Sequence, residues 1–264
     1  MFLGKMKISS INNSYIPLKI NFKALQQNKR LDLPNSNDYE LISHDYFCKK
    51  QLELQDKYRV QLQEICFPDG KLNNDIKKFL DETKFEFEKF GVKDEKTIGE
   101  KLSEAILTTQ YCEGDLYHAT FTSEVANKII KEGFNPEYIS RTKCGPGFYF
   151  TSSEGDARNY GSCVLKVFCK GKQARMKNDY YNDILNKSDI STKLKDYLNF
   201  KSINYSTGHV QSEICTRIIN EYCRNYIANE LGIDITYASS GSTCAIVVHN
   251  LDAISDIHQY TSRW

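Results

Sequence analysis

The sequence predicts an α+β protein, with helices in the N-terminal half and a β-sheet with flanking helices in the C-terminal half. Between residues 38 and 110, apolar side chains recur at steps of three, four and seven, which is the spacing of amphipathic helices. From Asp115 onwards, short apolar runs alternate with helical stretches and glycines. Strands with helices between them are typical of α+β domains.

Three regions are expected from the changes in pattern along the chain. Residues 1–36 are rich in Ser, Asn and Lys, and we interpret them as a loosely structured arm or one or two edge strands. Such a start also resembles the secretion leaders of some bacterial effectors. Residues 37–112 are predicted to be helical, with helices over about 47–65, 72–90 and 98–106, the last capped by Thr97 and Glu100.

Residues 113–264 are expected to form the sheet-containing domain. A long helix is predicted over 210–231, closed by Gly232. The predicted strands cover residues 115–119, 147–151, 163–169, 233–237 and 243–249.

The composition excludes several classes of protein. Lys and Arg number 35 against 34 Asp and Glu, which argues against a nucleic-acid surface and against a basic membrane-binding surface. No run approaches the roughly 18 apolar residues of a membrane span. The nine cysteines include no CxxC pair, so we expect reduced thiols in a cytoplasmic compartment and no metal site.

A first candidate binding element is the predicted strand Leu116–Thr120. His118 stands at its end, beside the small Ala119 and the hydroxyl of Thr120. The imidazole could donate a hydrogen bond to a ribose hydroxyl, and the backbone at Ala119 could approach a flat carboxamide. A structural histidine at a strand end is the alternative.

A second candidate element is the glycine-flanked strand that carries Tyr149. Tyr160 follows eleven residues later, after a short helix that Ser153 can cap. Two tyrosines on separate elements could enclose a planar heterocycle, and Gly147 would permit close backbone approach. The alternative is that both are core or rim residues, in a chain with 17 tyrosines.

In their order along the chain, these elements resemble the ADP-ribosyltransferases of the PARP and diphtheria-toxin class, marked by His, Tyr and Glu. The resemblance covers about residues 113–264, including the helix end Gly133-Phe134. It implies a split β-sheet core with flanking helices and NAD as substrate, without a metal. The residues it implies for NAD binding are His118, Ala119, Thr120, Gly147, Tyr149, Ser153 and Tyr160.

The Glu of that class has no counterpart at the corresponding place in this chain. The position falls in Gly241–Cys244, where Thr243 is the best-placed polar residue and Cys244 the next. Alternatively, Glu213 reaches in from elsewhere, although a first-turn Glu is ordinarily a helix-dipole partner. The candidate catalytic residues are therefore His118, Tyr149, Thr243 and Glu213.

The resemblance implies transfer of ADP-ribose to a protein acceptor, with release of nicotinamide. Without the Glu, mono-ADP-ribosylation is expected and polymer synthesis is not. Two alternatives stay open: an inactive NAD- or ADP-ribose-binding interaction module, and a related transferase that acts on nucleic-acid ends. A bacterial effector in a host cytosol and a cytoplasmic enzyme of the organism itself both fit.

Overall fold

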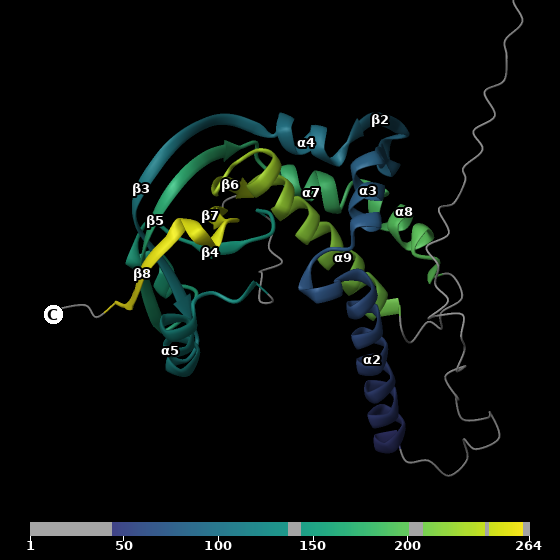
Figure 1. The fold of residues 1–264 in the computed structure, drawn as a ribbon, viewed down its shortest axis with the longest axis horizontal. Coiled ribbons are helices and arrows are strands. Elements are labelled where there is room, and N and C mark those ends of the chain that lie inside the picture. The colour runs from purple at the N-terminus through teal and green to yellow at the C-terminus, as the bar shows by residue number, and fades with distance from the viewer. Residues whose placement is uncertain (1–43, 137–143, 201–207, 241–242, 261–264) are drawn as a thin grey trace, which may run out of the picture. The chain divides into compact units, whose positions relative to one another are not determined.

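The computed structural model describes residues 44–136, 144–200, 208–240 and 243–260, and residues Cys48–Trp264 belong to one compact unit. The α+β class expected from the sequence is confirmed (Figure 1). The helices are α2 (His44–Cys66), α3 (Asn74–Glu82), α4 (Ile98–Glu104), α5 (Ser123–Glu132), α6 (Glu154–Arg158), α7 (Tyr180–Leu185), α8 (Ile190–Tyr197) and α9 (Gly208–Asn225). The strands are β1 (Lys84–Phe87), β2 (Val92–Thr97), β3 (Ile106–Thr120), β4 (Phe148–Phe150), β5 (Cys163–Met176), β6 (Ile235–Ser240), β7 (Thr243–Val248) and β8 (Ile254–Gln259).

The main sheet is built around β5. Its strand order is β3-β5-β6-β7-β4, and β8 also pairs with β5. β5 runs antiparallel to β3 from Cys163 to Met176. Its other edge is shared, because residues 173–175 pair in parallel with β6 and residues 165–169 pair antiparallel with β8. The sheet therefore divides along the length of β5.

The short strand β4 brings the far side of the sheet back to β3. It pairs with β7 through Tyr149↔Val247, and just beyond its end Thr151 forms a bridge with Tyr117 of β3. The two hydrogen bonds of that bridge are each 2.9 Å long. In Figure 1, β3 and β5 accordingly curve around β4, β6 and β7.

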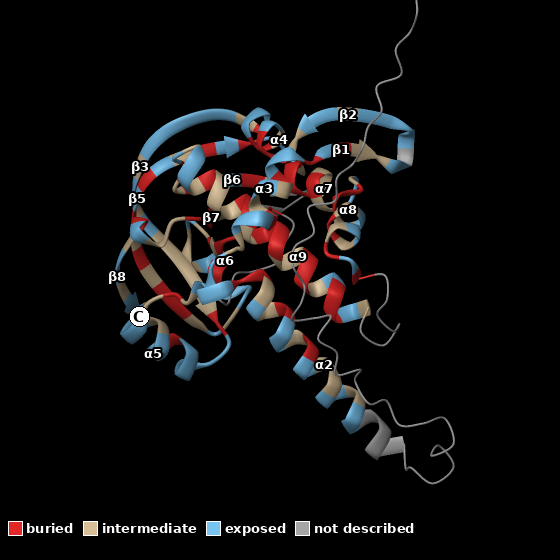
Figure 2. Ribbon diagram, turned by 45° about the vertical axis from the view of Figure 1, so that its right-hand side comes forward, coloured by how far each residue is buried: buried red, intermediate tan, exposed pale blue. Residues whose placement is uncertain are grey.

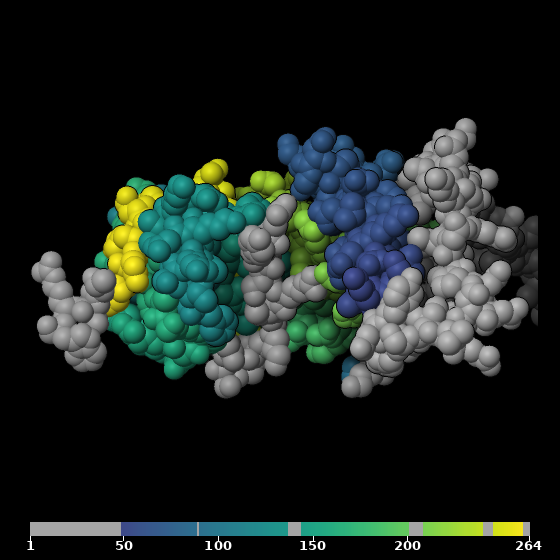
Figure 3. Space-filling view, turned by 90° about the horizontal axis from the view of Figure 1, so that it is seen from below, coloured from purple at the N-terminus to yellow at the C-terminus, as the bar shows by residue number. Residues whose placement is uncertain are grey.

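Apolar side chains cover both faces of the sheet. On one face, Phe134, Phe148 and Phe150 form a buried cluster with residues of β5, β6 and β7. There α5 lies beside β8, and their teal and yellow surfaces adjoin in Figure 3. On the other face, Tyr180 of α7 interacts with Thr236 of β6 and lies near Cys223 of α9.

The expected helix over residues 72–90 is wrong in its second half. α3 ends at Glu82, and residues 84–97 form the antiparallel hairpin β1–β2. Phe85 and Phe87 alternate with charged neighbours, which suits a strand, and Phe85 is buried. Gly91 lies between the strands with φ 61°, a left-handed conformation that favours glycine.

Two other expectations for the N-terminal half are confirmed, and a third is only partly correct. The helix expected over 47–65 is present as α2, and the capping box of Thr97 and Glu100 opens α4 as predicted. α4 ends at Glu104, however, and β3 already begins at Ile106. The boundary expected between the helical region and the sheet domain, at residues 112 and 113, thus falls inside β3. The arm expected over residues 1–36 lies outside the described residues.

The long C-terminal helix matches the predicted pattern. α9 continues into a π-helical turn, Tyr226–Glu230, and Gly232 follows with φ 59°. The helix buries Ile214, Ile218 and Tyr222 on one side, at the spacing of helical turns.

Replacing Ile218 by Ala should lower the free energy of unfolding by about 2–5 kcal/mol, because the side chain is fully buried and a cavity would remain. Thermal or urea unfolding measures the change. Ser212→Ala, on the exposed side of the same helix, is the matched control and should change stability by less than about 0.5 kcal/mol. Equal losses in the two variants would contradict the packing of α9.

Candidate active site at the ends of β3 and β4

The structure brings His118 against the backbone of Tyr149. The imidazole Nδ1 lies 2.8 Å from the Tyr149 carbonyl oxygen. A carbonyl oxygen only accepts hydrogen bonds, so Nδ1 carries the hydrogen and donates it. In the neutral ring, Nε2 is then an acceptor.

The surroundings of His118 favour this neutral ring. Phe134 meets the imidazole edge-on, with ring centroids 5.1 Å apart, and Phe150 is 5.5 Å away. Burial lowers the pKa of His118, and its hydrogen bond to Tyr149 opposes that effect only in part. The sequence-based expectation had the ring donate to a ribose hydroxyl, whereas in this neutral tautomer Nε2 can only accept a hydrogen bond.

Ala119 presents backbone groups that the sheet leaves open. Tyr117 directs its N–H and C=O towards Thr151. Backbone groups alternate along a strand, so those of Ala119 point to the same side, towards β4. Among the described residues they have no backbone partner there, because β3 and β4 separate after the bridge. An adjacent donor and acceptor of this kind match the two hydrogen-bonding groups of a carboxamide.

Tyr160 lies next to this open strand end. A Cβ placed on Gly161 would be 2.5 Å from the Thr120 carbonyl oxygen, so only glycine allows this approach of the two segments. The neighbouring residue Tyr160 is 57% exposed, so its ring is available for stacking. The Thr120 hydroxyl is buried and donates to the Thr122 carbonyl at 3.0 Å, so it serves the turn into α5.

Tyr149 directs its ring away from His118. Side chains alternate along β4, and Phe148 and Phe150 lie in the same apolar cluster that contacts His118. The Tyr149 ring therefore occupies the other face, and its hydroxyl donates to the Gly145 carbonyl at 2.5 Å. The structure thus joins His118 to the backbone of Tyr149 but does not bring the two rings face to face.

Two further predicted binding residues have structural tasks. A Cβ on Gly147 would be 2.5 Å from Val247 Cγ1 and 2.7 Å from the Val248 carbonyl oxygen, so this glycine permits close packing on β7. Ser153 caps the N-terminus of α6, because its hydroxyl accepts a hydrogen bond from the Asp156 N–H at 3.2 Å. These contacts account for Gly147 and Ser153 without a ligand.

The two candidates for the third catalytic position lie on different elements. Glu213 forms an ion pair with Arg59 at 3.4 Å, which joins α9 to α2. Thr243 begins β7, opposite Ser240 and four residues before Val247, the partner of Tyr149. The backbone of Thr243 is thus on the strand next to β4, whereas Glu213 on α9 forms its ion pair with Arg59 of α2.

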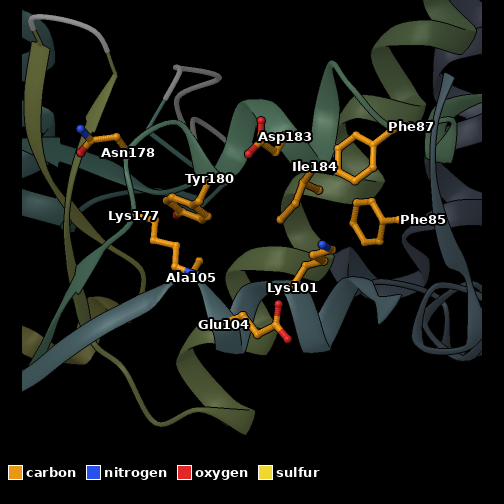
Figure 4. Close-up of a pocket in the computed structure, with 10 residues that line it drawn as sticks. All are labelled: Phe85, Phe87, Lys101, Glu104, Ala105, Lys177, Asn178, Tyr180, Asp183 and Ile184. Atoms are coloured by element: carbon orange, nitrogen blue, oxygen red, sulfur yellow. The ribbon is translucent and has the colours of Figure 1, made fainter. Parts of the chain in front are cut away.

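A cavity of about 160 Å³ lies beside Tyr180, which is one of its lining residues. The Tyr180 hydroxyl donates a hydrogen bond to the Cys144 carbonyl at 3.3 Å. Figure 4 shows the cavity between β1, α4 and α7, with Phe87 and Ile184 on one wall and Lys177 on another. Ligand pockets usually measure about 300–1,000 Å³, so a whole dinucleotide exceeds this space. A groove of about 310 Å³ over β3, β5 and β6 contains neither His118 nor Tyr149.

Comparisons with protein-family models, with curated proteins and with solved structures each gave no significant match. Within the described ranges, no group of three or more His, Cys, Asp and Glu side chains could hold a metal ion. No helix in the same part of the chain is long and apolar enough to cross a membrane. The site is therefore interpreted from its own geometry.

His249 has a structural role, as expected for a histidine without a ligand or catalytic partner at a suitable spacing in the sequence. The ring is fully buried, and its Nε2 lies 2.8 Å from the Thr236 hydroxyl oxygen, linking β6 to the end of β7. Burial, together with the Arg224 charge, lowers its pKa to about 3. The His side chains of the unfolded chain titrate near 6.5. Between about pH 3 and pH 6.5, His249 is therefore neutral in the folded protein but protonated in the unfolded chain.

Stability should consequently fall as the pH drops below about 6.5, by up to about 1.4 kcal/mol per pH unit from His249. The lowered pKa of His118 acts in the same direction. Urea unfolding at several values between about pH 7 and 5 measures the slope. His249→Gln should flatten it, whatever its effect at neutral pH. An unchanged slope in this variant would contradict the assignment.

Proposed function

We propose that this chain is a mono-ADP-ribosyltransferase that transfers ADP-ribose from NAD to a protein acceptor and releases nicotinamide. The observation that carries the proposal is the open backbone pair of Ala119, next to a neutral His118 and an exposed Tyr160 ring. Each of these groups suits one part of a nicotinamide riboside. Their order along the chain is also the order of the resembling family.

The nicotinamide end of the substrate would be held by backbone and ring. Its carboxamide N–H would donate to the Ala119 carbonyl, and its oxygen would accept from the Ala119 N–H. Tyr160 would stack on the pyridine ring, with the offset geometry that aromatic pairs favour. Gly161 supports this arrangement because it keeps Tyr160 against the end of β3.

His118 would orient the adjoining ribose. Its Nε2 would accept a hydrogen bond from a ribose hydroxyl, while Nδ1 remains bonded to Tyr149. Fixing the sugar in this way favours breakage of the bond from C1′ to the nicotinamide nitrogen, which develops positive charge on the ribose. The bonding electrons leave with nicotinamide. A nucleophile of the acceptor forms the new bond to C1′ and releases its proton to the solvent.

The divided sheet agrees with the proposed ADP-ribosyltransferase-like fold. β5 shares one edge between β6 and β8, and β4 closes the sheet towards β3, so the strands that carry His118 and Tyr149 meet at one end. We take Thr243, at the start of β7, as the residue at the position of the family Glu.

The second candidate function is an inactive NAD- or ADP-ribose-binding module. The observation in its favour is that residues Ser239–Cys244, where β6 connects to β7, include no Asp or Glu that could take the place of the family Glu. Such a module would bind NAD through the same Ala119 and His118 groups but would release no nicotinamide.

Incubation with NAD labelled in the adenosine part, in a cell lysate, should label a discrete protein. His118→Ala should reduce labelling by about 100-fold or more, because the ribose loses its fixed partner. His118→Gln is the informative companion, since its side-chain amide can both donate and accept hydrogen bonds. Tyr160→Ala should chiefly raise the KM for NAD, because stacking contributes to binding.

The control is Phe121→Ala. Phe121 is 84% exposed near the same strand end and has no assigned contact with NAD. Its labelling should match that of the wild type. NAD binding without nicotinamide release would favour the inactive module. Absence of NAD binding would contradict both functions.

The label should be a single ADP-ribose unit on each acceptor site. Elongation in the resembling family depends on the Glu that this chain lacks. Digestion of the labelled protein with a phosphodiesterase should release AMP and no phosphoribosyl-AMP, the product of internal polymer units, as read by mass spectrometry. Phosphoribosyl-AMP in the digest would contradict the assignment of Thr243 to the Glu position.

A further inference from the structure

The outer edge of β3 carries a row of backbone groups that have no backbone partner within the part of the chain that the structure describes. From Thr108 to Thr120, β3 pairs with β5 in continuous register. The Tyr117 bridge fixes which residues point outwards, because backbone groups alternate along a strand. The outward-pointing residues before it are Thr109, Tyr111, Glu113 and Asp115, and none has a backbone partner on that side within the described residues.

This edge is long and exposed. Figure 2 shows β3 as an outermost, largely pale-blue strand. Tyr111 is 65% exposed, and Leu107, near the start of the strand, is 51% exposed. An exposed edge of this length is a template for pairing with another strand.

Two of the usual protections against such pairing, lysine and proline, are missing from residues 108–116. Proteins commonly block edge strands with lysine, proline or a bulge. Residues 108–116 contain neither Lys nor Pro, and the pairing with β5 is regular throughout this segment. The acids do not leave a net charge, because Lys170 pairs with Glu113 at 3.4 Å and Lys166 pairs with Asp115 at 2.6 Å.

We propose that β3 pairs antiparallel with β3 of a second copy of this chain, so that two sheets join edge to edge in a twofold dimer. With the axis at Tyr111, this residue faces Tyr111 of the second copy, and Thr109 faces Glu113 of the second copy. Outward-pointing groups then meet outward-pointing groups, which gives about six hydrogen bonds.

The charges agree with this self-pairing. In the register centred on Tyr111, no acid lies opposite an acid, since Glu113 meets Thr109. Two exposed tyrosines become cross-strand neighbours, an arrangement that stabilises antiparallel pairs. A twofold interface needs such a self-complementary patch. Neither His118 nor Tyr160 takes part, so the dimer leaves the proposed active site accessible.

The test is the mass of the full chain, by sedimentation equilibrium from about 1 µM to about 500 µM. The wild type should dimerise within this range. Thr109→Pro removes an outward N–H but no bond to β5, and it should raise the dimer dissociation constant by about tenfold or more. Thr109→Val keeps the N–H and should leave the constant unchanged.

A second variant tests the same pairing without a proline, in case the Thr109→Pro variant misfolds. Tyr111→Lys keeps every backbone group but places two lysines face to face, and it should also favour the monomer. Tyr111→Phe is its control and should dimerise like the wild type. Circular dichroism should show that all four variants are folded.

Three outcomes would overturn the proposal: a wild type that is monomeric at every concentration, a dimer that persists in both Thr109→Pro and Tyr111→Lys, or a dimer lost equally in Thr109→Val. Tyr111→Cys adds a test of the register, because the two thiols would face each other at Cα distances that a disulfide spans. Absence of that crosslink in an oxidised dimer would overturn the axis at Tyr111.

Discussion

The antiparallel pairing of β3 with β5 is the constraint on which the other features of this protein depend. Because the register is continuous from Thr108 to Thr120, it fixes which side of β3 each backbone group faces. On the inner side, β5 is left with one edge to divide between β6 and β8. On the outer side, Tyr117 is the one residue of β3 with a strand partner among the described residues, in Thr151. The candidate site and the exposed edge both follow from that single bridge.

Backbone groups contribute as much to the candidate site as side chains do. The Tyr149 carbonyl sets the tautomer of His118. The separation of β3 from β4 leaves the Ala119 amide and carbonyl without a backbone partner among the described residues. Burial among phenylalanines keeps the imidazole neutral. A rigid sheet can hold such groups in place before a substrate arrives, which reduces the cost of reorganisation during a reaction. The acid-free hairpin between β6 and β7 limits what chemistry the proposed enzyme could perform.

Glycines and helix caps account for several residues that sequence patterns alone would assign to a ligand. Gly147 packs on Val247 and Val248, and Ser153 caps α6. Gly161, by contrast, matters for the proposed NAD site, because its close approach to Thr120 keeps Tyr160 beside β3. The signal for Gly161 is present in the sequence, but a glycine shows that a close contact is possible and not which segment makes it.

The sequence by itself determined the local features: the α+β class, the capping box at Thr97, the strand segment that carries His118, and the period of α9. Each depends on neighbours within a few residues. Tertiary structure decided the rest. Residues 84–97 form a hairpin because pairing and burial of Phe85 outweigh the helical pattern before them, and Glu213 lies against Arg59 because α9 packs on α2. The open groups of Ala119 arise where β4 leaves β3, and pairing between strands distant in sequence leaves no periodic pattern in the chain.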